Sequence, residues 1–181
     1  MTRLEVLKIS YEPTNKNYSV ILKEVEGNLC LPVIIGSFEA QSIALAIEAI
    51  ETPRPLTHDL ICDIINIVDL DLSSIIIDKL DDGIFYSKIV MDNRDSEPLF
   101  VDARPSDSIA IAIRLDVPIF ISSELLNEVG VEKVYLGKKN IKKINKSSSL
   151  KSLKVKLKLA IDEEEYEKAA KIRDTINRLE S

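Results

Sequence analysis

The sequence predicts an α+β domain, with a mixed sheet of about six to eight strands and three to four helices, followed by a C-terminal α-helical hairpin. Three observations support this prediction. Strand-type and helix-type patterns follow one another in a mixed order rather than in strict alternation. Asp82-Gly83 lies between two apolar runs, which is a strong hairpin signal. Composition and charge change abruptly after residue 137.

The expected strands are short apolar or alternating runs bounded by Gly, Pro, Asn or Asp. Gly27-Asn28 predicts a turn before the run Leu29 to Ile35, which is apolar enough to be buried on both faces. The eight expected strands cover residues 4–11, 18–25, 29–35, 74–80, 84–91, 99–101, 118–121 and 131–136.

The expected helices carry apolar residues at three- and four-residue spacing. Gly36-Ser37 ends a strand, and a helix with Glu39 in its first turn then extends to about Glu51. A second helix runs from the stretch around His58 to about residue 68, a third from Pro105 to about 115, and a short fourth from Ser122 or Ser123 to Gly130.

Charge divides the chain into a domain at residues 1–137, a Lys/Ser-rich linker at 138–149 and a helical hairpin at 150–181. Residues 1–137 carry a net charge of -12, and residues 138–181 carry +6. The acidic domain is poorly suited to tight duplex binding but suits the recruitment of divalent cations. Cys30 and Cys62 lie in apolar stretches and predict buried thiols rather than a zinc site. With no leader or long apolar run, we expect a cytoplasmic protein without a membrane partner.

The segment from Lys138 to Lys158 contains nine lysines and no acidic residue, and it can be interpreted in two ways. They form a solvated linker, or they make weak contacts to a nucleic-acid backbone without aromatic stacking partners. The following helices each present one apolar face, and about thirty residues are too few for a stable core. We therefore expect the hairpin to pair with another copy or another protein.

One polar turn dominates the domain, in the stretch Phe100 to Ile109. A short strand ends in Asp102-Ala103-Arg104, and Pro105 then opens a helix in which Ser106 or Asp107 can cap the free amides. Two carboxylates and a guanidinium at a helix N-terminus can hold a phosphate, directly or through a metal ion.

The same pattern occurs earlier, in Thr52 to Leu60. Arg54-Pro55 is followed by a hydroxyl residue, by the single histidine, His58, and by Asp59. Each stretch taken alone is well explained by ordinary helix capping. If the two helix starts face each other across one cleft, they form a single site.

Three blocks in this order resemble the bifunctional nuclease (BFN) domain family. They are Leu31-Pro32-Val33-Ile34-Ile35-Gly36 with Glu39-Ala40, Arg54-Pro55-Leu56-Thr57-His58-Asp59-Leu60, and Asp102-Ala103-Arg104-Pro105-Ser106-Asp107-Ser108-Ile109-Ala110. The tail around Glu165 to Asp174 resembles a UVR motif, the hairpin of the UvrB and UvrC repair subunits. The resemblance implies nuclease activity on RNA and DNA, homodimerisation of the first domain and a protein partner for the hairpin.

Combined with the polar motifs, this resemblance predicts metal-assisted hydrolysis of phosphodiester bonds in RNA or DNA. The predicted Mg²⁺ or Mn²⁺ ligands are Asp59, Asp102 and Asp107, with Glu39 as a further candidate. Arg54 and Arg104, with Ser106, are expected to bind phosphate oxygens. His58 is expected to act as general acid or base, or as a metal ligand, beside Asp59, Asp102 and Asp107 as the other catalytic candidates. The alternative for His58 is a structural role, in which a residue at the helix start bonds to a carbonyl.

Two other functions fit the same residues. In the first, the chain is a non-catalytic dimeric adaptor or regulatory binding protein, and the Asp-Arg clusters are buried locks that stabilise the fold. In the second, the helix N-termini bind a small phosphate metabolite as a sensor. Full burial of the Asp-Arg cluster, with every carboxylate paired to Arg, would favour the adaptor, whereas an open cleft would favour the nuclease.

Overall fold

The structure, a computed structural model, describes residues 1–13, 16–68, 70–92, 97–132, 157 and 172–173. The chain divides into two compact units, Met1–Leu80 with Phe85–Lys133 and Asp81–Ile84 with Val134–Ser181. The helices and the body of the sheet belong to the first unit. The predicted linker at 138–149 lies outside the described residues, as does almost all of the predicted hairpin at 150–181.

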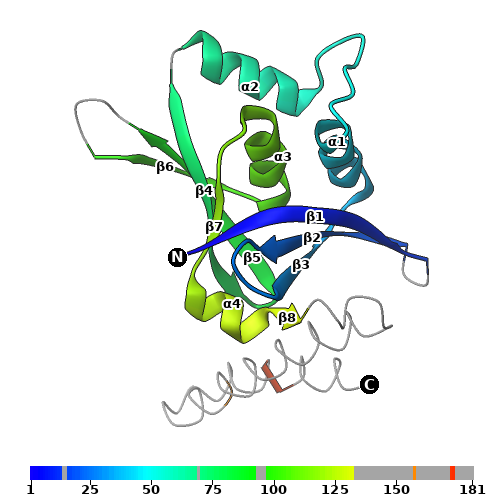
Figure 1. The fold of residues 1–181 in the computed structure, drawn as a ribbon, viewed down its shortest axis with the longest axis vertical. Coiled ribbons are helices and arrows are strands. Elements are labelled where there is room, and N and C mark those ends of the chain that lie inside the picture. Colours follow the sequence, from blue (N-terminus) through cyan, green and yellow to red (C-terminus); the bar gives the residue numbers. More distant parts are fainter. Residues whose placement is uncertain (14–15, 69, 93–96, 133–156, 158–171, 174–181) are drawn as a thin grey trace. The chain divides into compact units, whose positions relative to one another are not determined.

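The first unit is built on one sheet of eight strands, in the order β6-β5-β4-β7-β1-β2-β3-β8 (Figure 1). The sheet is mixed, because β4 and β7 pair in parallel whereas β1 pairs antiparallel with both β2 and β7. The strands are β1 (Thr2–Glu12), β2 (Asn17–Glu24), β3 (Leu29–Ile35), β4 (Asp71–Asp81), β5 (Ile84–Asp92), β6 (Leu99–Ala103), β7 (Ile119–Ile121) and β8 (Val131–Glu132).

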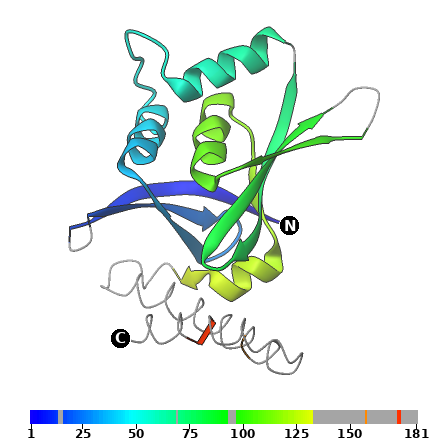
Figure 2. The ribbon, with the colours of Figure 1, turned by 180° about the vertical axis from the view of Figure 1, so that it is seen from behind.

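Four helices occur in the described part of the chain up to residue 132: α1 (Ser37–Ile47), α2 (Thr57–Ile67), α3 (Pro105–Leu115) and α4 (Ser123–Val129). Helix α3 packs between α1 and α2, and α1 also packs on β2 (Figures 1 and 2). The predicted α+β class is therefore confirmed, with eight strands and four helices. None of the described helices is both long and apolar enough to cross a membrane.

Aliphatic side chains from the sheet and the three larger helices form the core. Val20, Ile21 and Leu22 of β2 are all completely buried, so this strand is covered on both faces. Ile43 of α1 and Ile109 of α3 are also completely buried. Burying a side chain of this size contributes roughly 1.5–3 kcal/mol. The core thus fixes α1 and α3 against the sheet, and both of these helices contribute to the site.

Helix α1 ends earlier than the sequence pattern predicts, at Ile47 instead of Glu51. Ala49 adopts a left-handed conformation with φ of 49°, and the amide of Ile50 donates to the carbonyl of Leu45. This is a Schellman ending, in which a residue with positive φ satisfies the last carbonyls of the helix. Glycine usually fills that position, so the alanine gave no signal in the sequence, and Ile50 continued the apolar spacing although it is exposed.

An ion pair connects α2 to α3. Nε of Arg114 donates to Oδ1 of Asp59 over 2.6 Å, and the same guanidinium donates to the backbone carbonyls of Ala110 and Ser42. The Arg114 side chain is 11% exposed and the Asp59 side chain 32%. Asp59 also accepts from the backbone amide of Leu56, which makes it a helix-capping residue. Arg114 therefore joins all three larger helices.

Hydrogen bonds from Arg114 and from the Leu56 amide hold the pKa of Asp59 below its usual 3.8. A carboxyl group with a lowered pKa in the folded state stabilises the fold above its unfolded pKa, and this contribution is lost as the pH falls through the folded value. We expect Asp59→Ala to lower the free energy of unfolding by about 1–2 kcal/mol at pH 7, and by much less near pH 2. Urea unfolding at both pH values measures this difference.

Asp63→Ala is the matched control, because Asp63 is an exposed aspartate in the same helix. It should change the free energy of unfolding by no more than about 0.5 kcal/mol at either pH. Equal losses for Asp59→Ala and Asp63→Ala would contradict the structural role given to the Arg114 pair.

Candidate functional site

A polar cluster forms where α1, α2 and the start of α3 meet. Arg104 is the N-cap residue of α3 and has an extended backbone, with φ of -68° and ψ of 144°. Pro105 follows at the first helical position, where its fixed φ and missing N–H are both favourable. Asp107 lies in the first turn, so its side chain and that of Arg104 leave the backbone on the same short segment. The sequence therefore sets this pair locally.

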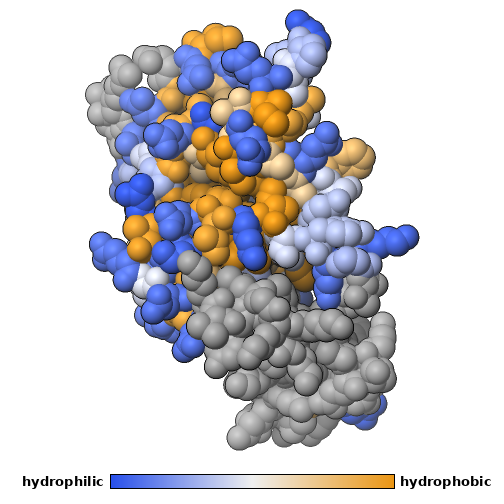
Figure 3. Space-filling model, turned by 45° about the vertical axis from the view of Figure 1, so that its right-hand side comes forward, coloured by the Kyte–Doolittle hydropathy of each residue, from blue (hydrophilic) through white to orange (hydrophobic). Residues whose placement is uncertain are grey.

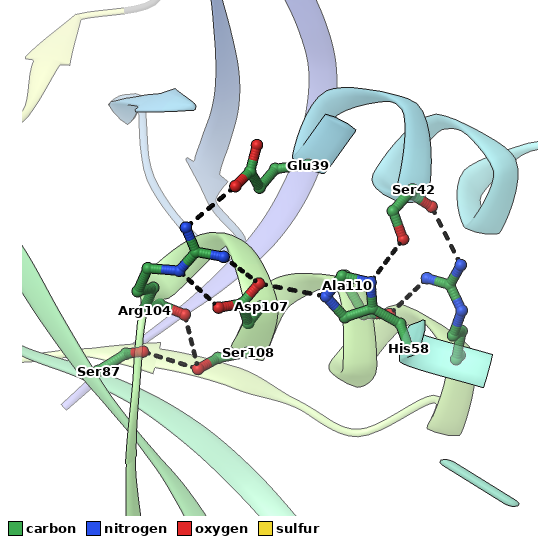
Figure 4. Close-up of polar contacts among 9 residues, drawn as sticks. Glu39, Ser42, His58, Ser87, Arg104, Asp107, Ser108 and Ala110 are labelled. Carbon is green, nitrogen blue, oxygen red and sulfur yellow. Dashed lines mark hydrogen bonds and ion pairs between the residues drawn. The ribbon is translucent and has the colours of Figure 1, made fainter. Parts of the chain in front are cut away.

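Arg104 holds two carboxylates at once (Figure 4). Its Nε and Nη2 donate to the two oxygens of Asp107 over 2.7 and 3.0 Å, which is a bidentate pair. Its Nη1 donates to Oε1 of Glu39, in the first turn of α1, over 3.0 Å. These contacts engage three of the five guanidinium N–H groups. The two others form no hydrogen bond with the described part of the protein, and the Arg104 side chain is 67% exposed.

His58, in the first turn of α2, continues the network on the other side of Asp107. Its Nε2 lies 3.2 Å from Oδ1 of Asp107, and its Nδ1 lies 2.9 Å from Oγ of Ser42 on α1. A carboxylate can only accept, so Nε2 carries a proton. When the imidazole is neutral, Nδ1 is therefore an acceptor, and the Ser42 hydroxyl donates to it. The geometry fixes the tautomer.

The charges in the cluster hold Asp107 in its ionised form. Burial alone would raise the pKa of its carboxyl group, but the hydrogen bonds and positive charge of Arg104, together with the hydrogen bond from His58, bring it below the usual 3.8. The hydrogen bond and the charge of Asp107 in turn raise the pKa of Arg104. The cluster thus contains a permanent cation, a permanent anion and a histidine between that anion and a hydroxyl group.

Two buried serines support the backbone at the start of α3. The hydroxyls of Ser87 on β5 and Ser108 on α3 are 2.7 Å apart, and both residues are completely buried. The carbonyl of Ala103 lies 2.7 Å from the Ser87 hydroxyl, and the carbonyl of Arg104 lies 3.2 Å from the Ser108 hydroxyl. Each hydroxyl has a single proton, so one serine donates to the other, and the serine that accepts donates its own proton to its carbonyl. These bonds connect the turn before α3 to the sheet, so the position of Arg104 is set by tertiary contacts and by the local helix start.

The cluster lies along a cavity of about 690 Å³. Its lining includes the charged or titratable residues Glu39, His58, Arg104 and Asp107. The same lining includes the apolar residues Phe38, Pro55, Leu56 and Ile61. This cavity is large enough for a nucleotide-sized ligand. The Asp-Arg cluster is therefore open to a cleft, as expected for the nuclease, whereas both of its carboxylates are paired to Arg104, as expected for the adaptor.

The structure brings four of the predicted site residues together: Glu39, His58, Arg104 and Asp107. It places the four others elsewhere. Asp59 pairs with Arg114 and lines a second cavity of about 650 Å³. Asp102 is an exposed residue of β6 whose register partner is Lys88. Arg54 is exposed and does not line the first cavity, and Ser106 is buried. The capping role expected for Asp107 is also absent, since no side chain caps α3.

The predicted metal set does not assemble. Among the residues that the structure describes, no three His, Cys, Asp or Glu side chains form a group that could hold a metal ion. The carboxylates of Asp59, Asp102 and Asp107 do not form one group, and Arg104 donates to both Asp107 and Glu39. Arg104 holds the position between these two oxygens that a cation would need, so these residues do not fit the predicted ion.

Sequence reasoning missed Ser42 and Arg114. Ser42 lies three residues after Glu39, so both leave α1 on the same side, and this spacing was the available signal. Its small hydroxyl sits among apolar helix residues and carries no motif of its own. Arg114 sits in the last turn of α3, where a cation is ordinary, so only the structure shows its bond to Asp59.

The bifunctional nuclease domain family matches residues 20–134, which include every residue of the cluster. The UvrB/uvrC motif matches residues 147–181. An uncharacterized protein of Mycobacterium tuberculosis is 39% identical over 131 residues, covering 72% of this chain and 77% of that protein. Bifunctional nuclease 1 of Oryza sativa is 24% identical over 65% of this chain and 37% of its own length. Bifunctional nuclease 1 of Arabidopsis thaliana is 22% identical over 87% of this chain and 55% of its own length.

These matches agree with the three sequence blocks that carried the resemblance, two of which supply the Arg104–Asp107 pair and His58. This chain belongs to the bifunctional nuclease domain family and carries a UvrB/uvrC motif at its C-terminal end.

Proposed function

We propose that this protein hydrolyses phosphodiester bonds of RNA or DNA at the cluster formed by Glu39, Ser42, His58, Arg104 and Asp107. The observation that carries the proposal is the position of His58, held between Asp107 and the Ser42 hydroxyl beside an exposed guanidinium, along one cavity. The family membership and the names of the plant relatives support nucleic acid as the substrate class.

Each residue has a role that follows from its contacts. The two remaining N–H groups of Arg104 bind the non-bridging oxygens of the phosphodiester, because a planar guanidinium matches the geometry of a phosphate. Asp107 holds the imidazole in one tautomer and stabilises its protonated form, as a carboxylate does beside a catalytic histidine. Glu39 fixes the guanidinium from the opposite side. Arg104 is therefore oriented before the substrate arrives, which reduces the entropic cost of binding.

Proton transfer follows the hydrogen bonds. A water molecule attacks phosphorus and gives its proton to Oγ of Ser42, while the Ser42 hydroxyl proton passes to Nδ1 of His58. The bond from phosphorus to the leaving oxygen breaks, and the imidazolium returns a proton to that oxygen by the same route. No atom of the protein is covalently modified.

The residues of this proton relay can be tested by substitution. We expect His58→Gln to lower kcat by a factor of about 10²–10⁴, because the proton acceptor is lost. Asp107→Asn should also lower kcat, since it removes the charge that stabilises the imidazolium. Hydrolysis of a fluorescent single-stranded RNA measures both effects. Unchanged rates in both variants would exclude this cluster as the active site.

Arg54 and Arg104 allow a matched comparison, because each precedes a proline at the start of a helix. Arg104→Gln should raise KM and lower kcat/KM by roughly tenfold or more, since it removes a charge-assisted contact of about 1.5–3 kcal/mol. Arg54→Gln should leave both parameters within twofold, because Arg54 lies outside the cavity wall. An equal loss in the two variants would contradict the assignment of phosphate binding to Arg104.

Metal dependence forms a separate prediction. Because Arg104 already occupies the position between Glu39 and Asp107, we expect activity to persist after dialysis against EDTA, within about twofold of the untreated protein. Assays with added Mg²⁺ or Mn²⁺ complete the comparison. Loss of activity in EDTA and its return with Mn²⁺ would contradict the metal-free relay and would support the metal-assisted mechanism expected from the sequence.

The homodimer expected from the sequence is part of this proposal, and an apolar stripe on α2 supports it. Leu60, Ile64 and Ile67 follow one another at helical spacing and are 53%, 50% and 81% exposed. An apolar stripe of this kind is characteristic of a protein–protein contact. The UvrB/uvrC motif supports a second, protein partner for the C-terminal part of the chain.

The dimer can be tested by placing a charge on this stripe. Ile64→Asp should convert the dimer into a monomer in sedimentation-velocity experiments, because burying an unpaired carboxylate is unfavourable. Ile84→Asp changes an isoleucine of similar exposure in β5, and it should leave the sedimentation coefficient unchanged. A wild-type monomer, or a dimer that tolerates Ile64→Asp, would contradict this part of the proposal.

A further inference from the structure

Phe38 is the most exposed large apolar side chain among the described residues, at 83%. It lies in the first turn of α1, directly before Glu39, whereas Ala40 and Ile43 face the core. The hydrophobic effect therefore favours covering this ring with a ligand or partner. Figure 3 shows hydrophobic and hydrophilic surface side by side on the face turned toward the viewer. The residues that line the same cavity as Phe38 indicate which kind of ligand covers its ring.

Phe38 shares its cavity with Arg104 and His58. The lining therefore includes an aromatic ring, aliphatic side chains and a guanidinium that keeps two N–H groups for a ligand. A nucleotide offers a counterpart to each, because its phosphate is an anion and its base is a flat, weakly polar ring. Arg104 favours a phosphate over an uncharged apolar segment, because a guanidinium forms charge-assisted hydrogen bonds with an anion.

We propose that Phe38 is a stacking platform for one unpaired nucleobase next to the phosphate held by Arg104, and that it makes the protein selective for single-stranded nucleic acid. This inference rests on the proposed function for its substrate class. In a duplex both faces of a base are already stacked, so an aromatic side chain can engage only a base that is unstacked or splayed out.

Stacking on Phe38 also predicts that the protein does not distinguish strongly among the four bases. Every base has a π-face, so stacking on phenylalanine tolerates any sequence. The same lining contains Pro55, Leu56 and Ile61, which pack on a base without reading its hydrogen-bond pattern, and it also contains the polar residues Gln41 and Thr57, which are given no base-reading role in this proposal. We therefore expect discrimination between single strand and duplex without strong preference among the four bases.

The absence of tryptophan from the chain provides a direct experiment. Phe38→Trp introduces a single indole whose fluorescence is quenched when a base stacks on it. The variant is titrated with a single-stranded oligonucleotide, with an oligonucleotide of the same length made of abasic sites, and with a blunt duplex. We expect saturable quenching by the single strand and no more than a tenth of that quenching by the abasic strand or the duplex.

Phe100→Trp is the matched control, because Phe100 is an exposed phenylalanine of β6 that does not line this cavity. Its fluorescence should not change with any of the three ligands. Phe38→Ala should weaken binding of the single strand roughly tenfold, as expected for the loss of one stacking contact, and Phe38→Tyr should restore it. Fluorescence anisotropy of a labelled oligonucleotide measures these affinities.

Three outcomes would overturn the inference: equal quenching by the abasic strand, unchanged affinity of Phe38→Ala, or a changed sedimentation coefficient of Phe38→Ala with unchanged oligonucleotide binding. The last outcome would assign Phe38 to a protein contact. The binding assay does not require turnover, so the two proposals fail separately. Base-dependent quenching without hydrolysis would support stacking and refute the nuclease. Hydrolysis without quenching would support the nuclease and refute stacking on Phe38.

Discussion

The site depends on the bidentate pair between Arg104 and Asp107. Without the guanidinium, Asp107 and Glu39 would be two partly buried carboxylates facing one cavity, and their repulsion would favour protonation of one of them. With the guanidinium in place, Asp107 stays ionised and can orient His58 through Oδ1. The histidine tautomer, the Ser42 hydrogen bond and the direction of proton transfer all follow from that one ion pair. In the proposed function, Arg104 thus acts on the imidazole through Asp107 as well as on the substrate.

Arg104 and Asp107 are close in sequence, but the residues that complete the cluster with them are not. Residues 104 and 107 come from one helix start, whereas His58 and Ser42 arrive from α2 and α1 through the packing of three helices. Two different polar supports hold those helices in register. Arg114 joins the helices on one side, through Asp59 and two backbone carbonyls, and the buried Ser87–Ser108 pair ties the start of α3 to the sheet on the other. Both supports reach the cluster through backbone carbonyls, Arg114 at Ser42 and Ser108 at Arg104, so they set the position of the cluster without using its side chains.

The two Arg-Pro motifs show what the sequence could and could not reveal. Their patterns are nearly the same, and the sequence correctly indicated two helix starts that come together, with Arg104, Asp107, His58 and Glu39 in one cluster. It could not reveal that Asp59 turns to Arg114, because that choice depends on which cation the folded chain brings within reach. Local signals likewise gave most strand and helix bounds, but they missed the end of α1, where Ala49 adopts a conformation that glycine usually fills. The errors lie where tertiary contacts or an unusual residue overrode a local preference.

The charges of the cluster give the apolar residues of the same cavity a role in substrate affinity. When His58 is neutral, two carboxylates outnumber one guanidinium, and the cavity does not attract a polyanion strongly. When His58 is protonated the four charges balance, and a phosphodiester is accepted more readily, but Nδ1 can then no longer take the Ser42 proton. Attraction of the phosphodiester is therefore stronger with a charged imidazole, whereas acceptance of the Ser42 proton requires a neutral one. In the proposed function, stacking on Phe38 supplies substrate affinity that does not depend on charge, so binding of the substrate does not have to rely on a positively charged imidazole.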